Sequence, residues 1–169
     1  MKEIGIRRSI REYSDKAVSK EDIEKILRSA MQAPSACNQQ GTRYLVVDDK
    51  VLLNEVSSRF KTMRFANMAS FIIVFLIDKT NLIAPQMATQ DASAATQNAM
   101  LEAVSLGIGS CWCGVSGRED RVEEVKKLFN LKENLEPFSI VTFGYPLKED
   151  AFKYIDRYDP KKVYFNKVA

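Results

Sequence analysis

The sequence predicts an α+β or α/β domain built around a small sheet, and three observations lead to this fold class. Amphipathic segments with helical spacing alternate along the chain with apolar runs of strand length. The 169 residues fit a single domain over 1–169, which can bury roughly 70% of the surface of its unfolded form. A content of 46% hydrophobic and 28% charged residues excludes a disordered chain.

The first predicted helix begins at Ser19, a preferred N-cap residue, and Asp22 follows three residues later as in a capping box. Its apolar residues have the i, i+3, i+4 spacing of a helix that faces a core: Ile23, Ile26, Leu27, Ala30 and Met31. We expect it to end by Ala33, because Pro34 disfavours helical geometry in the preceding residue. A loop at 33–42 then leads to a strand at 43–47.

The rest of the chain continues this alternation. We expect a short helix at 51–60, a central strand at 70–78 and a long helix at 89–106, for which Gly107 is a natural C-terminal stop. A strand or loop at 108–115, a charged helix at 119–129 and a buried strand at 138–146 follow. The tail, 148–169, has no clear periodicity. Small residues spread around more than one face of the long helix and permit close packing on several sides: Ala92, Ala94, Ala95, Ala99 and Ala103.

Charge and hydropathy exclude several classes of partner. A net charge of +3 is too small to indicate nucleic acid binding, and no segment approaches the roughly 20 apolar residues that span a bilayer. The N-terminus has no apolar region of a secretory signal, and three cysteines are an odd number. We therefore expect a cytoplasmic protein with reduced thiols, without a membrane or nucleic acid partner.

The sequence contains no histidine, which excludes histidine-dependent triads and histidine-ligated zinc. Cys111 and Cys113 lack the C-x₂-C spacing of metal and redox motifs, and we interpret them as small apolar residues of a strand. Trp112 between them is interpreted as a core or interface residue. No metal site is predicted, and an enzyme with this composition would rely on a cofactor for its chemistry.

The stretch "RRSIREY" gathers Arg7, Arg8, Ser9 and Arg11. In an extended segment Arg7, Ser9 and Arg11 share one side, and on a helix Arg7 and Arg11 share a face. Guanidinium groups held close together repel unless an anion lies between them, and their geometry matches phosphate oxygens. A phosphate site and an ordinary solvated cluster both remain open on these residues alone, and the solvated cluster is the commoner case.

Two other segments contain residues that suit the binding of a ligand. The loop "PSACNQQ" offers Pro34, Ser35, Asn38 and Gln40, whose neutral donors and acceptors suit the rim of a heterocycle, although an ordinary polar turn explains them equally. "GIGSCWCG" resembles a dinucleotide fingerprint but fails it, because Trp112 occupies the third glycine position and the motif follows a helix. A permanently bound NAD in a Rossmann fold is not expected.

Taken in order, three stretches resemble the FMN-dependent nitroreductase family: "RRSIREYSDKAVSKEDIEKILRSAMQAPSACNQQ", "QDASAATQNAMLEAVSLGIGSCWCGV", and "FGYP" followed by "DRYDPKKVYFNK". The resemblance covers nearly the whole chain and favours the phosphate interpretation of the arginines. It implies a three-layer α/β/α fold with a small mixed, mainly antiparallel sheet. It also implies an intertwined homodimer with FMN at the subunit interface, NAD(P)H as transient co-substrate, and the alanine-rich helix in the dimer core.

The resemblance also implies roles for residues. Arg7, Arg8, Ser9 and Arg157 would hold the phosphate and ribityl end of FMN, and Arg11 would lie toward the pyrimidine edge. Pro34, Ser35 and Asn38 would reach the flavin from the partner chain. The backbone around Trp112, Cys113 and Gly114 would approach the ring and offer an amide near N5. No side chain is expected to act as a catalytic acid or base, because hydride transfer at N5 requires stacking and orientation.

The sequence departs from the family at two places. Gly41 and Thr42 follow Gln40 where the family often has an aromatic residue, and the segments 61–68 and 79–90 are short where larger members insert helices. We expect an open acceptor pocket and an NAD(P)H-dependent reductase of nitroaromatics or quinones with a ping-pong mechanism. An FMN storage or redox-sensing protein, a relative such as a reductive dehalogenase, and a non-flavin domain whose arginines bind another phosphate or a nucleic acid remain alternatives. No redox role is expected for Cys37.

Overall fold

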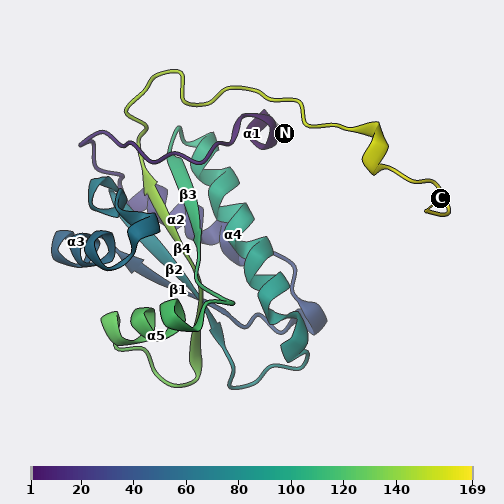
Figure 1. Ribbon diagram of the computed structural model, residues 1–169, viewed down its shortest axis with the longest axis horizontal. Helices are drawn as coiled ribbons and strands as arrows, with labels where there is room; N and C mark the ends of the chain where they lie inside the picture. The colour runs from purple at the N-terminus through teal and green to yellow at the C-terminus, as the bar shows by residue number, and fades with distance from the viewer. Residues whose placement is uncertain (1, 169) are drawn as a thin grey trace.

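The computed structural model describes residues 2–168 and contains a four-stranded sheet in the order β1-β2-β4-β3. All neighbouring strands of this sheet are antiparallel (Figure 1). The strands are β1 (Thr42–Val47), β2 (Phe71–Asp78), β3 (Gly109–Gly114) and β4 (Leu135–Gly144). The α-helices are α1 (Lys2–Ile6), α2 (Lys20–Met31), α3 (Lys50–Arg59), α4 (Ala88–Ser105) and α5 (Glu119–Leu128).

Helices cover both faces of the sheet, α2 and α4 on one side and α3 and α5 on the other (Figure 1). Each face has its own apolar cluster. Ile26, Ala99 and Phe143 belong to the α2 and α4 side, whereas Leu53 and Val125 belong to the α3 and α5 side. The central strands β2 and β4 are therefore buried on both faces, which explains their continuous apolar sequences. The predicted three-layer fold is confirmed.

The predicted elements agree with the observed ones to within a few residues. The Ser19 side chain accepts a hydrogen bond from the main-chain N–H of Asp22 at 3.1 Å, so the N-cap of α2 is confirmed. Gly107 follows α4 with a φ of 73°, as a helix stop requires. The segment at 108–115 forms strand β3. The short helix α1 was not predicted, because five residues carry too little periodicity.

The sheet contains no parallel pair among the described strands, so the expectation of a mixed sheet is met only by one isolated bridge. That parallel bridge joins Ser9 to Ser110, and the main-chain N–H of Ile10 donates to the Ser110 carbonyl at 2.9 Å. The N-terminal segment thus lies along the outer edge of β3. A Cβ on Gly109 would stand 2.8 Å from the Ile10 side chain, so this close approach requires a glycine.

The small residues of α4 are used inside the single chain. Ala92, Ala95, Ala99 and Ala103 are buried against the sheet and α2, in the same cluster as Ile26 and Phe143. Only Ala94 of the five predicted residues is half-buried. The buried alanines therefore belong to the core of the chain itself, and they lend no separate support to a dimer core at α4.

The C-terminal segment 151–168 leaves the body of the molecule as an extended chain, with one short turn of helix at Pro160–Lys162 (Figure 1). Several large apolar side chains on it are exposed: Tyr154, Ile155, Tyr158, Val163, Tyr164, Phe165 and Val168. Between residues 2 and 168, no helix has the length and apolar character needed to cross a membrane.

Candidate functional site

Arg7, Arg8 and Arg157 line one cavity of about 580 Å³, between α1 and the C-terminal segment. The remaining lining residues are Ile4, Gly5, Tyr154, Ile155 and Asp156. A hydrogen bond of 3.2 Å from the main-chain N–H of Ile155 to the carbonyl of Gly5 holds the two segments together. Arginines from opposite ends of the sequence therefore meet at one hollow in the surface.

Arg8 has a partly structural role in this cavity. Its terminal nitrogens donate to the main-chain carbonyls of Arg7, Gly5 and Lys153, the one to Gly5 at 2.9 Å. Its Nε is buried, and no partner for it is found within residues 2–168. An unsatisfied buried donor is costly, and an anion in the cavity would satisfy it. Arg8 thus ties the N-terminal segment to the C-terminal segment and leaves one donor without a partner among the described residues.

Asp156 is the one carboxylate that the described residues place at this cavity. Its Oδ1 accepts the main-chain N–H of Tyr158 at 2.9 Å, so the acid is engaged with its own backbone. With three guanidinium groups and one carboxylate, this cavity carries an excess of positive charge. This donor set, with the unpaired Nε of Arg8, fits a phosphate monoester such as that of FMN.

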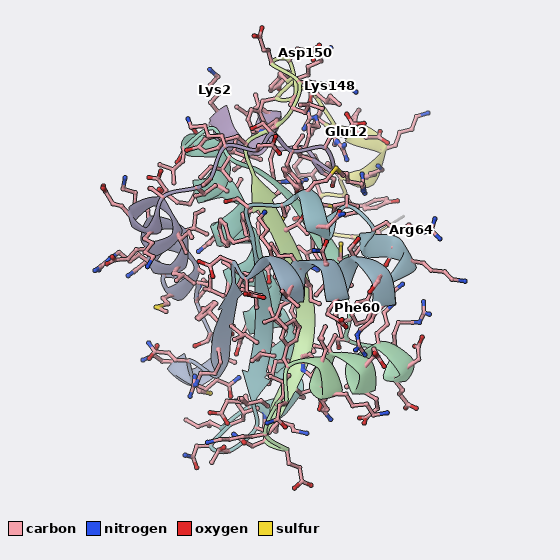
Figure 2. All side chains as sticks on the ribbon, turned by 90° about the vertical axis from the view of Figure 1, so that its left-hand side faces the viewer. Lys2, Glu12, Phe60, Arg64, Lys148 and Asp150 are labelled. Carbon is pink, nitrogen blue, oxygen red and sulfur yellow. The ribbon has the colours of Figure 1, made fainter. Side chains whose placement is uncertain are left out.

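Ser9 and Arg11 line a second, smaller cavity of about 260 Å³ with Glu12, Pro146 and Lys148 among its walls. Glu12 and Lys148 form an ion pair of 3.0 Å, and both lie at the same end of the molecule in Figure 2. The Arg11 guanidinium lies 5.9 Å from the centre of the Phe65 ring. The extended backbone brings Ser9 and Arg11 to one side as predicted, whereas Arg7 lines the first cavity with Arg8.

The loop that follows α2 lies elsewhere. Pro34, Ser35 and Gln40 line a third cavity of about 380 Å³, together with Tyr44 and Asp91. Asn38 belongs to the same loop, is exposed, and accepts a hydrogen bond at Oδ1 from Gln40 Nε2 at 3.1 Å. Tyr44, one of the residues that line this cavity, is partly buried, and this burial raises the pKa of its hydroxyl group.

The two groups of predicted residues are separated by the length of helix α4. The loop contacts the first turn of α4 at Asp91, while the N-terminal segment crosses β3 just after α4 ends (Figure 1). From Asp91 to Ser105, the last residue of α4, the helix rises by about 21 Å. A single chain therefore does not bring Arg7 and Asn38 to one small ligand.

Strand β3 presents an open edge next to the N-terminal segment. The Ser110 carbonyl accepts the Ile10 N–H, and the Gly114 carbonyl accepts a hydrogen bond of 2.9 Å from Arg121 Nη1, so both carbonyls point away from β4. Because backbone groups alternate along a strand, the N–H groups of Trp112 and Gly114 face this edge too, and that of Cys113 faces β4. Apart from the chain neighbours of Gly114, no atom of residues 2–168 lies within 4 Å of a Cβ built on it, so a flat ligand has room there.

The side chains around this edge are part of the core. Trp112 packs edge-on against Phe138 with ring centres 5.8 Å apart, and Cys111 and Cys113 are buried in the cluster on the opposite face. Contact with Cys111 and burial raise the pKa of Cys113 well above its usual range. The burial of both side chains agrees with the interpretation of the two cysteines as apolar strand residues. Cys37 is exposed on its loop.

Sequence reasoning missed three residues at these sites. Asp91 holds the loop and Arg121 holds Gly114, but both are single charges in helices and stand out by no motif. Tyr13 is buried under the N-terminal segment, and its hydroxyl lies 2.7 Å from both the Ile10 carbonyl and Thr142 Oγ1. Burial raises its pKa far above the usual range.

Comparison with known proteins identifies the class. The Nitroreductase family matches residues 4–63 and 52–145 of the chain. A relative from Archaeoglobus fulgidus, provisionally named NADH dehydrogenase/NAD(P)H nitroreductase, is 44% identical over 99% of this chain and 97% of its own. The chain belongs to the nitroreductase family.

Solved structures agree with this assignment. A protein from Clostridium acetobutylicum, provisionally named NADH oxidase, has a TM-score of 0.94 and 41% identity over 98% of this chain and 99% of its own. A provisionally named nitroreductase from Desulfovibrio desulfuricans, solved in complex with FMN, has a TM-score of 0.83 and 26% identity over 99% of this chain and 96% of its own.

Proposed function

We propose that this chain is an FMN-dependent oxidoreductase, which uses NAD(P)H to reduce an electron-poor acceptor such as a nitroaromatic or a quinone. The observation that carries the proposal is the cavity lined by Arg7, Arg8 and Arg157. The FMN complex of the Desulfovibrio relative and the name of the Archaeoglobus relative support the cofactor and the co-substrate.

In this proposal Arg7 and Arg157 bind the phosphate of FMN, with the Nε of Arg8 as a further donor. Ser9 lies toward the ribityl chain and Arg11 toward the pyrimidine edge, where a positive charge stabilises electron-rich forms of the ring system. The N–H groups of Trp112 and Gly114 meet the ring at the open edge of β3, with that of Cys113 turned toward β4. Bound FMN would accept a hydride from the nicotinamide and pass reducing equivalents to the acceptor.

The proposed assembly is a homodimer with FMN at the subunit interface. Pro34, Ser35 and Asn38 of one chain would reach the flavin held by the arginines of the other. The separation of these two groups by the length of α4 supports this arrangement, since one chain alone leaves them far apart. The exposed apolar side chains of segment 151–168 support it as well, because they require a surface to cover them.

One set of experiments tests the function. We expect the purified protein to be yellow, to release FMN on denaturation, and to oxidise NAD(P)H when a nitroaromatic or quinone is added. Initial rates at several acceptor concentrations should give parallel double-reciprocal lines, as nicotinamide and acceptor take turns at one flavin face. Intersecting lines would contradict the ping-pong mechanism. A yellow protein without turnover would indicate storage or sensing instead, and a colourless one that takes up no FMN would refute the proposal.

A further inference from the structure

Asp91 is a buried acid whose two carboxylate oxygens both face the loop at 34–40. It lies in the first turn of α4 and is 9% exposed. Oδ1 accepts the main-chain N–H of Ala36 at 3.0 Å, and Oδ2 accepts the Gln39 side-chain amide at 2.6 Å. The proposed function gives Asp91 no role.

Gln39 extends this connection to a second element. Its Oε1 accepts the main-chain N–H of Ala84 at 2.9 Å, and its Nε2 also donates to the Ala84 carbonyl at 3.2 Å. Every polar atom of the Gln39 side chain is therefore used. We call Asp91, Gln39 and these four hydrogen bonds the loop clamp, because they join the loop to α4 and to the segment before it.

The loop needs such a clamp, because its backbone is strained. Cys37, Asn38 and Gln40 have φ values of 51°, 51° and 47°. Non-glycine residues in this left-handed region cost about 1 kcal/mol each and persist only where their surroundings hold them. Within the loop, Ser35 Oγ accepts the Gln40 N–H at 3.0 Å, but this bond alone does not attach the loop to the rest of the fold.

We infer that Asp91 is a positioning residue, which through the loop clamp holds Ser35 and Asn38 in place for the flavin. This inference rests on the proposed function, in which those two residues contact FMN. Asp91 acts through the loop in this proposal, since each of its oxygens accepts a hydrogen bond from a loop residue. The loop acts on the ring and ribityl portion, whereas Arg7 and Arg157 act on the phosphate.

Because the loop and the arginines contact different parts of FMN, their contributions to binding can be measured separately. We predict that Asp91→Asn weakens the binding of FMN and of riboflavin, which lacks the phosphate, by the same factor of about tenfold. The side-chain amide introduced at position 91 still offers an oxygen to the main-chain N–H of Ala36. Its NH₂ group, however, faces the side-chain NH₂ group of Gln39, so two donors meet and no hydrogen bond forms between them. Dissociation constants are measured by flavin fluorescence on the apoprotein, at a temperature where both proteins are fully folded, so that a change in global stability does not enter.

A second substitution tests the direct contact. In Asp91→Asn/Gln39→Glu, the amide of residue 91 can donate to the carboxylate of residue 39, which restores the contact with donor and acceptor exchanged, although the bond to the Ala84 carbonyl is lost. We expect binding to return to within about threefold of the wild type. Gln39→Glu alone places two carboxylates together and should weaken binding by at least about tenfold. A matched control is Glu102→Gln, which changes another acid of α4 that accepts a hydrogen bond from Ser29, away from the loop.

The outcomes distinguish a failure of the proposed function from a failure of the positioning role of Asp91. If the wild type binds no FMN, the proposed function is wrong. If the wild type binds FMN and Asp91→Asn binds it equally well, or the double variant recovers nothing, the positioning role is refuted. Hydrogen exchange on the unsubstituted protein gives a check that needs no variant. The Ala36 amide should exchange far more slowly than in an unstructured chain, and exchange at the unstructured rate would overturn the clamp.

Discussion

Arg7 and Arg157 line the same cavity although they lie near opposite ends of the sequence. Two guanidinium groups of equal charge are held there by neutral contacts, among them the hydrogen bond from Ile155 to Gly5. Placing like charges together costs free energy, which the single carboxylate that the described residues place at the cavity, Asp156, offsets only in part. A dianionic ligand recovers it, and this is the physical basis for assigning the cavity to a phosphate.

The phosphate assignment predicts the effect of Arg157→Ala. Loss of one charge-assisted interaction should weaken FMN binding by about 10- to 100-fold and leave riboflavin binding unchanged. The measurement is a pair of fluorescence titrations on the apoprotein. Arg28→Ala is a suitable control, because Arg28 pairs with Glu24 on the exposed side of α2. Equal weakening for both ligands would place Arg157 away from the phosphate.

Tyr13 predicts a stability effect. Its hydroxyl contacts the Ile10 carbonyl and Thr142 Oγ1 in a buried position, so Tyr13→Phe leaves both partners without it. We expect the free energy of unfolding to fall by about 1 to 2 kcal/mol, measured by urea denaturation. Ser58→Ala, which removes a hydroxyl group from an exposed position of α3, should change it by less than about 0.5 kcal/mol. An unchanged midpoint for Tyr13→Phe would show that these hydrogen bonds contribute nothing net.

Asp78 predicts an acid-dependent stability. Hydrogen bonds from Thr80 and Asn134 lower its pKa from 3.8 to about 2. Because the folded pKa lies below the unfolded one, the stabilisation is fully present above pH 4 and is lost as the pH falls toward 2. The side chain is partly screened by solvent, so we expect Asp78→Asn to cost on the order of 1 kcal/mol at pH 7.

The same substitution should cost much less near pH 2. Urea unfolding at pH 7, 4 and 2 measures the difference from the wild type. Asp150→Asn is the control, since Asp150 pairs with Lys153 on the surface. A cost for Asp78→Asn that is the same at every pH would contradict the role of its charge.

The exposed C-terminal segment predicts the oligomeric state. Replacing Val163, Tyr164 and Phe165 by serine removes apolar surface that a partner chain would cover, so the dimer should shift toward monomer. Light scattering after size-exclusion chromatography measures the mass. Val51→Ser changes an exposed apolar residue of α3 and should leave the mass unchanged. A wild-type protein that is monomeric at micromolar concentration would contradict the proposed assembly.

Local patterns in the sequence were sufficient for most of the fold. The N-cap at Ser19, the stop at Gly107 and the apolar run of β2 each depend on neighbouring residues, and each is found in the structure. Helix α1 was not predicted, because its five residues are too few to show a helical pattern. The packing of the α4 alanines inside the chain leaves their predicted place in a dimer core untested, because composition does not tell whether a small residue packs within its own chain or against another.

The candidate site was predicted less completely, because its contacts join distant parts of the chain. Nothing local indicated that Arg8 binds the Lys153 carbonyl or that Asp91 holds Ala36. The orientation of β3 was equally hidden. Which of Trp112, Cys113 and Gly114 turns its N–H outward depends on the register with β4, and register is a tertiary property.

The most direct test of the central claim is the affinity of Arg7→Glu for FMN and for riboflavin. The reversed charge in the cavity should leave a folded protein that has lost nearly all FMN binding and keeps its riboflavin binding. Arg28→Glu, with the same change of charge on the surface of α2, should bind both ligands like the wild type. Undiminished FMN binding by Arg7→Glu would show that the cavity between the two ends of the chain does not hold the phosphate.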